Sequence, residues 1–267
     1  MSLKLIEETQ QIIQLAEDIT KKKFQFIEKE DLYYFAQVKP ARKHMPYHLV
    51  FYKSKYNELI NHLIAHECSH IIRMFSVSEA DRLIPITDDA TKKNAFAEIG
   101  SYINKISFLI PLNELNQIMN MWYSGTINQV TNQPPDLMIE KWIYDEYPNL
   151  RELQLQSINK QYEEAVMGLS GRVSRITPKK IFEASNIMNY CFYKYLDVYI
   201  KTNYSQAYAD FKYRQRGEEL AKITQNYDND YHGDIKMITK WAKYLSIVKW
   251  FDWTDFENVP QNYESMI

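Results

Sequence analysis

The chain has 267 residues and a formal net charge of −2, with basic and acidic side chains interspersed along it. This balance excludes the concentrated positive charge by which proteins bind nucleic acid or an anionic membrane. Two cysteines in a chain of this length form no disulfide framework and are typical of a reducing compartment. The chain has no run of about 18 apolar residues and no apolar signal-peptide core at its N-terminus, so a cytoplasmic protein that neither spans nor binds a membrane is predicted.

Nothing in the composition marks a boundary between domains. Only 6 glycines and 9 prolines occur, and no stretch is rich in Ser, Gly or Pro. Linkers usually carry such a bias. The sequence therefore predicts a single domain over 1–267, with a sheet and one long helix in 1–76 and a helical portion in 77–267.

The first third of the chain changes from one hydrophobic period to another. Apolar residues recur at helical spacing over 3–22, which predicts an amphipathic helix. Segments rich in aromatic and β-branched residues follow at 24–27, 33–38 and 47–52, separated by polar or Pro-containing turns, and predict a small antiparallel sheet. The helical period then returns over 57–75 as a long helix.

The rest of the chain is predicted to be almost wholly helical. Two proline sites, Pro134 with Pro135 and Thr177 with Pro178, are expected to start helices, because proline is tolerated in the first turn. The sequence thus indicates an α+β fold that is mostly helical. The predicted helices cover 92–109, 112–123, 135–147, 150–167, 178–201, 205–225 and 233–248.

The helix predicted at 57–75 contains His66, Glu67 and His70 in the segment LIAHECSHII, which matches the HExxH pattern. Four residues advance a helix by about 6 Å and about 40° of rotation, so the two histidines lie on one face within reach of a single ion. Glu67 lies about 100° round from His66, where it is poorly placed to bind the ion but near enough to hydrogen-bond a water molecule on it. The apolar flanks predict burial, and two buried imidazoles with a carboxylate would leave polar groups unpaired without a metal.

The segment LIAHECSHII, following a small sheet, resembles the zincin peptidases. The resemblance implies hydrolysis of peptide bonds in a peptide or protein substrate, with His66 and His70 as ligands of Zn²⁺ and Glu67 as the general base. It also implies that the strand before the helix, here 48–52, borders a cleft to which an extended substrate adds as a further strand. The stretch HECSHIIR, in a chain of this size without a signal peptide, is similar to intracellular peptidases of the ImmA/IrrE type.

A catalytic zinc usually has three protein ligands, so a third ligand is required. The metzincin pattern is excluded because Arg73 and Ser76 stand where it requires Gly and His, which leaves a Glu or Asp from a later helix, the gluzincin arrangement. Glu140 is the preferred candidate, because the apolar residues of PPDLMIEKWIY imply burial and a buried carboxylate needs a cation. Glu98, in KKNAFAEIGSYI, is the runner-up. The remaining acidic candidates are Glu79, Asp81 and Asp145.

A second class of function stays open, in which the protein is a catalytically inactive zinc-binding regulatory or interaction protein. Such a structural site is normally closed by a fourth ligand, and Cys191 or His232 is available to supply it. The presence of Glu67 favours the enzyme. His62 lies one turn before His66, and we expect it to be a hydrogen-bonded histidine near the cleft rim, because a helix rarely supplies three ligands to one ion.

Overall fold

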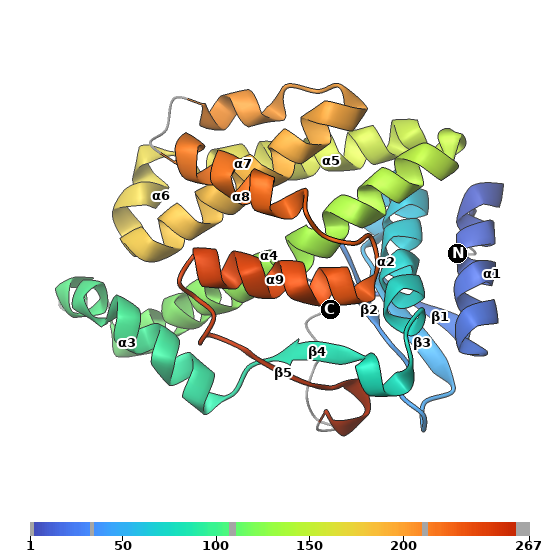
Figure 1. Ribbon diagram of the computed structural model, residues 1–267, viewed down its shortest axis with the longest axis horizontal. Coiled ribbons are helices and arrows are strands. Elements are labelled where there is room, and N and C mark those ends of the chain that lie inside the picture. Colours follow the sequence, from blue (N-terminus) through green and yellow to red (C-terminus); the bar gives the residue numbers. More distant parts are fainter. Residues whose placement is uncertain (1–2, 33–34, 107–110, 210–212, 260–267) are drawn as a thin grey trace.

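The computed structural model describes residues 3–32, 35–106, 111–209 and 213–259. The N-terminal part contains α1 (Glu7–Thr20), β1 (Lys23–Glu28), β2 (Ala36–Lys39), β3 (Tyr47–Tyr52) and α2 (Ile60–Phe75). The remainder contains β4 (Leu83–Ile86), α3 (Asp89–Ile106), α4 (Leu112–Glu146), α5 (Arg151–Met167), α6 (Gly171–Ile176), α7 (Lys179–Ile200), α8 (Arg214–Thr224), α9 (Tyr231–Tyr244) and β5 (Asp252–Asp255). The prediction of a mostly helical α+β fold is confirmed (Figure 1).

The N-terminal sheet has three strands in the order β1-β3-β2. The central strand β3 runs antiparallel to β2 and parallel to β1, so the sheet is mixed and not antiparallel throughout. The parallel pair arises because β2 intervenes in sequence between β1 and β3 and reverses the chain direction. The strands β1 and β2 are therefore the two edges of this sheet.

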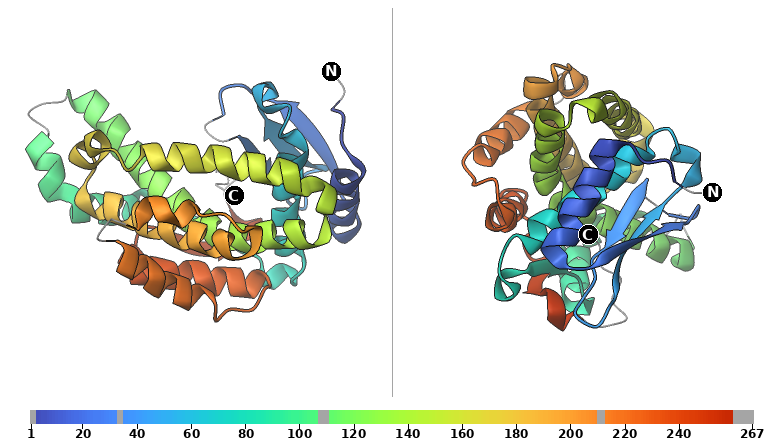
Figure 2. Two further views of the ribbon diagram at one scale, coloured as in Figure 1. Left: turned by 90° about the horizontal axis from the view of Figure 1, so that it is seen from above. Right: turned by 90° about the vertical axis from the view of Figure 1, so that its right-hand side faces the viewer.

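One face of the sheet is covered by α1 and α2. Alternate residues of the strands, Val38, Val50 and Tyr52, are buried, as the two-residue period of a half-covered strand requires. They share a buried cluster with Ile12 of α1 and Ile64 of α2. This packing fixes α2, the helix that carries HECSH, against the sheet at one end of the molecule (Figure 2).

The long helix α4 connects the two halves of the structure. The Pro134–Pro135 pair, predicted to start a helix, lies inside α4, and the sequence-based break between 123 and 135 is wrong. Each proline removes the N–H that would bond the carbonyl four residues earlier. Packing on both sides offsets this loss, because Ile139 and Ile143 belong to the cluster formed with α2, while Leu137 belongs to the helical core.

The helical core is formed chiefly by α3, α4, α7, α8 and α9. The pair β4 and β5 was not predicted, and it joins 83–86 to 252–255 in antiparallel pairing. Met74 at the end of α2 packs with Ile84 and Phe256 beside this pair, so the C-terminal segment is tied to the HECSH helix. Among the described helices, none combines the length and the apolar character needed to cross a bilayer.

Other predicted boundaries differ locally. The predicted helix over 205–225 divides into a short 3-10 turn at Tyr204–Tyr208 and α8. Residues 33–34 of the predicted strand, 107–109 of the predicted helix over 92–109 and 210–212 of the helix over 205–225 lie outside the described residues.

His48 is buried in the sheet as a neutral side chain. Its ring lies 4.9 Å from that of Phe24 and 5.6 Å from that of Phe75, between centroids. The Ala41 N–H donates to its Nδ1 at 2.8 Å. Burial lowers the pKa of His48 to about 4, and the charge of Lys22 acts in the same direction.

His48 should make the protein less stable in acid. Its unfolded pKa is near 6.5 and its folded pKa about 4, so the unfolded chain binds the extra proton and stability falls as pH drops from 6.5 towards 4, by up to roughly 3 kcal/mol. His48→Asn keeps an acceptor for Ala41 and removes this titration. Urea unfolding at pH 7, 5.5 and 4.5, with a chelator present, should give a shallower pH dependence for the variant, and parallel curves would contradict the assignment.

Candidate metal centre

Three potential ligand atoms converge between α2 and α4. His66 Nε2 and His70 Nε2 lie 3.2 Å apart. Asp136 Oδ1 lies 3.3 Å from the first and 3.2 Å from the second. The histidines are one turn apart on α2, and Asp136 follows the double proline of α4. These atoms form a nearly equilateral triangle of two imidazole nitrogens and one carboxylate oxygen, a group capable of holding a metal ion.

The Asp136 oxygen in this triangle lies between two histidine rings. Asp136 Oδ1 is buried and pairs with His66 Nε2 at 3.3 Å and with His70 Nε2 at 3.2 Å. A buried carboxylate oxygen is costly without a donor or a cation. A buried carboxylate oxygen between two imidazole nitrogens therefore fits a bound cation.

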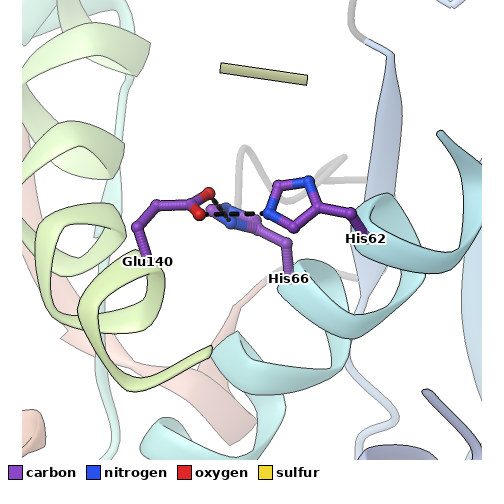
Figure 3. Close-up of side chains that lie close together, drawn as sticks. All are labelled: His62, His66 and Glu140. Atoms are coloured by element: carbon purple, nitrogen blue, oxygen red, sulfur yellow. Dashed lines mark hydrogen bonds and ion pairs between the residues drawn. The ribbon is translucent and has the colours of Figure 1, made fainter. Parts of the chain in front are cut away.

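A second carboxylate, Glu140, lies one turn further along α4 on the other side of His66. Its Oε1 is 2.8 Å from His66 Nδ1 and its Oε2 is 3.0 Å from His62 Nε2 (Figure 3). Gln154 of α5 donates its Nε2 to Glu140 Oε2 at 2.5 Å and to the Glu140 carbonyl at 2.7 Å. Glu140 and His62 are almost completely buried, so this cluster ties α2, α4 and α5 together.

The group His62, His66 and Glu140 is also compatible with a metal ion. Ordinary hydrogen bonds account for it, however, because each Glu140 oxygen already has a partner at normal distance. When His66 donates its Nδ1–H to Glu140, its Nε2 lone pair faces His70 and Asp136. The structure thus places Glu140 beside His66, as expected. Glu140 contacts Nδ1 of that ring, however, whereas Nε2 is the nitrogen that faces His70.

The charges around these residues favour a cation. Burial opposes ionisation of Asp136 and Glu140, yet their histidine partners hold the pKa of each carboxyl below its usual range. Burial likewise disfavours a charged His66, but Asp136 and Glu140 raise the pKa of that imidazole well above its usual value. The cluster is therefore arranged to stabilise positive charge at His66 Nε2.

Glu67 faces the same cavity as the three converging ligand atoms. Burial raises the pKa of its carboxyl, against the influence of the charges of His70 and His66. The Val38 N–H of β2 donates to this carboxylate. The edge strand beside the site is therefore β2, and the expectation that 48–52 occupies this place is wrong, because β3 is the central strand of the sheet.

A cavity of about 460 Å³ opens in front of these groups. It is bounded by β2, α2, α4 and α5. Its walls are rich in side-chain amides, which offer both donors and acceptors to a bound molecule. The amides are those of Gln37, Asn128, Gln129, Asn132, Gln133 and Gln161.

Arg73 attaches α9 to the end of α2 that carries His70. Its Nε and Nη2 each donate to a carboxylate oxygen of Asp234 at 2.7 Å. Its Nη1 donates to Asn229 Oδ1 at 2.8 Å. Burial raises the pKa of Asp234, while the charges of Arg73 and His70 oppose that rise. This two-bond pair fixes the first turn of α9 beside the site.

Several predicted candidates lie elsewhere. Glu98 on α3 accepts a hydrogen bond from Lys180 and belongs to neither group of potential ligands. Cys191 is buried in the helical core with its Sγ 3.5 Å from Thr224 Oγ1, and His232 is exposed on α9. Within the described residues, neither of these two joins a group of potential ligands.

Sequence reasoning overlooked Asp136. The sequence signal that could have identified Asp136 is its spacing from Glu140. Two residues four apart on one helix lie on the same face, so both carboxylates can contact successive turns of a neighbouring helix. The choice between them required the geometry of that helix pair.

Comparison with known proteins gives no independent assignment. No protein-family model, curated protein or solved structure matches this chain.

Replacing Arg73 by Met should lower the free energy of unfolding by about 3–5 kcal/mol, because Asp234 would remain buried without its partner. Urea unfolding in the presence of a chelator measures this loss apart from metal binding. Arg172→Met, which removes an exposed arginine of α6, is the control and should change stability little. A loss below about 1 kcal/mol would mean that the pair behaves like a surface ion pair.

Proposed function

We propose that this protein is a zinc-dependent peptidase in which His66, His70 and Asp136 hold the ion and Glu67 is the general base. The observation that best supports this proposal is the triangle of potential ligand atoms with sides of 3.2–3.3 Å. Nitrogen and oxygen ligands at about 2.0–2.1 Å from a tetrahedral zinc lie roughly 3.3–3.4 Å from one another. The donor set and its spacing therefore fit zinc with the fourth position open.

This ligand set revises the role proposed for Glu140. A carboxylate on the outer nitrogen of a ligand histidine fixes its tautomer and orientation and raises its basicity. Glu140 has this position relative to His66, and His62 and Gln154 hold it there. We therefore assign Glu140 to positioning His66 and the ligand role to Asp136.

The chain's own groups suit hydrolysis of a peptide bond. Bound zinc polarises a carbonyl oxygen and lowers the pKa of water. Glu67 accepts the proton of the attacking water and transfers it to the leaving amine, and the raised pKa that burial gives its carboxyl supports both transfers. The outer edge of β2, where the Val38 N–H meets Glu67, offers main-chain groups to an extended peptide.

The catalytically inactive alternative has less support from the site. A structural zinc is normally closed by four protein ligands, whereas the group at His66 contains three among the described residues and faces a cavity. The carboxylate of Glu67 faces that cavity without belonging to the ligand group. Both features favour a reacting molecule at the fourth position.

Elemental mass spectrometry should find about one zinc per wild-type chain, measured together with iron and manganese. Asp136→Ala should lose the metal, because a ligand is removed. Glu140→Gln should keep it at saturating zinc but bind it roughly 10–100-fold more weakly, as expected for a residue that orients a ligand. Glu98→Gln is the control and should match the wild type. Full zinc retention and unchanged affinity in Asp136→Ala would overturn the ligand assignment.

Glu67→Gln separates the enzyme from the inactive alternative. The amide keeps an acceptor for the Val38 N–H but cannot take a proton, so peptide cleavage should fall by at least about 100-fold while zinc content stays near one per chain. Cleavage of a mixed peptide library, followed by mass spectrometry, gives the rate. A zinc-loaded wild type that cleaves nothing in the library, or a variant as active as the wild type, would argue against the peptidase mechanism.

A further inference from the structure

The cavity in front of Glu67 is elongated by the two helices that form its walls. On α4 it extends from Asp136 back to Gly125, and on α5 it extends to Gln161 and Glu164. Eleven residues of helix correspond to roughly 16 Å. The cavity is therefore a groove leading away from the ligand triangle, long enough for roughly four or five residues of extended chain.

Gly125 keeps this groove open. A glycine inside a helix costs stability relative to alanine, so a reason in packing or function is expected. Packing supplies none, because a Cβ at this position would meet no atom within 4 Å. Since Gly125 lines the groove, a side chain there would occupy space that the fold leaves free.

The charged side chains that line the groove are acidic. Its described lining residues include the carboxylates of Glu67, Asp136 and Glu164, and no lysine or arginine. In the proposed zinc site, Asp136 and Glu67 balance the two positive charges of the ion. Glu164 is then the remaining carboxylate of the lining; it is exposed to solvent and makes no hydrogen bond or ion pair with another described residue.

The position of Glu164 sets a distance from the reacting bond. Gln154, which bonds Glu140 beneath His66, lies ten residues before Glu164 on the same helix, a rise of roughly 15 Å. The ligand triangle lies at Asp136, one turn of α4 nearer to the groove, so this rise is an upper limit to the distance between Glu164 and the reacting bond. A peptide in extended conformation covers roughly 15 Å in about four residues, and a long basic side chain shortens the requirement by one. A cationic side chain two or three residues from the cleaved bond would therefore reach Glu164.

We infer that the groove binds a peptide segment carrying lysine or arginine two or three residues from the scissile bond, and that Glu164 selects this side chain. The position of the scissile bond rests on the proposed peptidase function, and the charge balance rests on the proposed zinc site, whereas the binding preference requires no cleavage. Gly125 contributes by leaving room for the chain between α4 and α5.

The test measures binding apart from cleavage. Zinc-loaded Glu67→Gln protein is titrated into fluorescein-labelled pools of 12-residue peptides that differ only in one fixed residue, arginine or glutamate, placed at successive positions. Fluorescence anisotropy should show the arginine pool binding roughly fivefold tighter at its best position, the scale of one exposed ion pair. Adding Glu164→Gln should reduce this preference below about twofold.

Two further variants serve as controls. The neighbouring Glu163 is exposed like Glu164, but it accepts a hydrogen bond from Asn159 and does not line the groove, so Glu163→Gln should keep the full preference. Gly125→Leu should weaken binding of both pools at least tenfold without lowering the unfolding midpoint, because it adds a good helix former while filling the groove.

The outcomes separate this inference from the peptidase proposal. Equal binding of the two pools, or a preference that survives Glu164→Gln, overturns the inference even if the wild type cleaves peptides. A Glu164-dependent preference in a protein whose wild type cleaves none of the pools supports the inference and removes the peptidase proposal.

Discussion

The site depends on one buried carboxylate. Glu140 accepts hydrogen bonds from His66 and His62 of α2 and from Gln154 of α5, while its own backbone lies in α4. A buried carboxylate with a hydrogen-bond donor on only one of its oxygens would strongly destabilise the folded protein. These hydrogen bonds therefore specify how three helices meet, and they do so around the ring of a proposed ligand. Displacing any of the helices would break a buried polar contact around Glu140.

The helix α4 makes this arrangement possible because it belongs to both halves of the structure. Its apolar residues enter the cluster with α2 and the helical core alike. The double proline lies immediately before Asp136, where it removes two helical hydrogen bonds. Strong packing on either side holds the helix through that defect. In this way α4 presents two carboxylates, one turn apart, to two successive turns of the HECSH helix.

The sequence was informative where chemistry is local and less so where helices had to be placed against one another. The spacing of His66, Glu67 and His70 depends only on helix geometry, and the burial of Glu140 followed from its apolar neighbours. The distinction between Asp136 and Glu140 depends on the rotation and height of α4 relative to α2, which no local pattern encodes. The Pro134–Pro135 pair misled for a related reason, since tertiary packing overrides a local helix-breaking preference. The edge position of β2 is likewise decided by strand order, a non-local property.

The energetics of the polar cluster favour a bound cation as part of the native state. Three imidazoles and two carboxylates lie between two apolar clusters, where burying polar groups is costly. Hydrogen bonds satisfy Glu140, whereas Asp136 Oδ1 and the two Nε2 atoms lie 3.2–3.3 Å from one another. Protonating His66 would offset part of the cost, and the raised pKa of that imidazole reflects this compensation. A divalent ion at the centre of the triangle satisfies all three atoms together, whereas a proton satisfies one pair at most. A metal ion bound at this site would therefore be coupled to the correct docking of α4 on α2, since each would favour the geometry that the other requires.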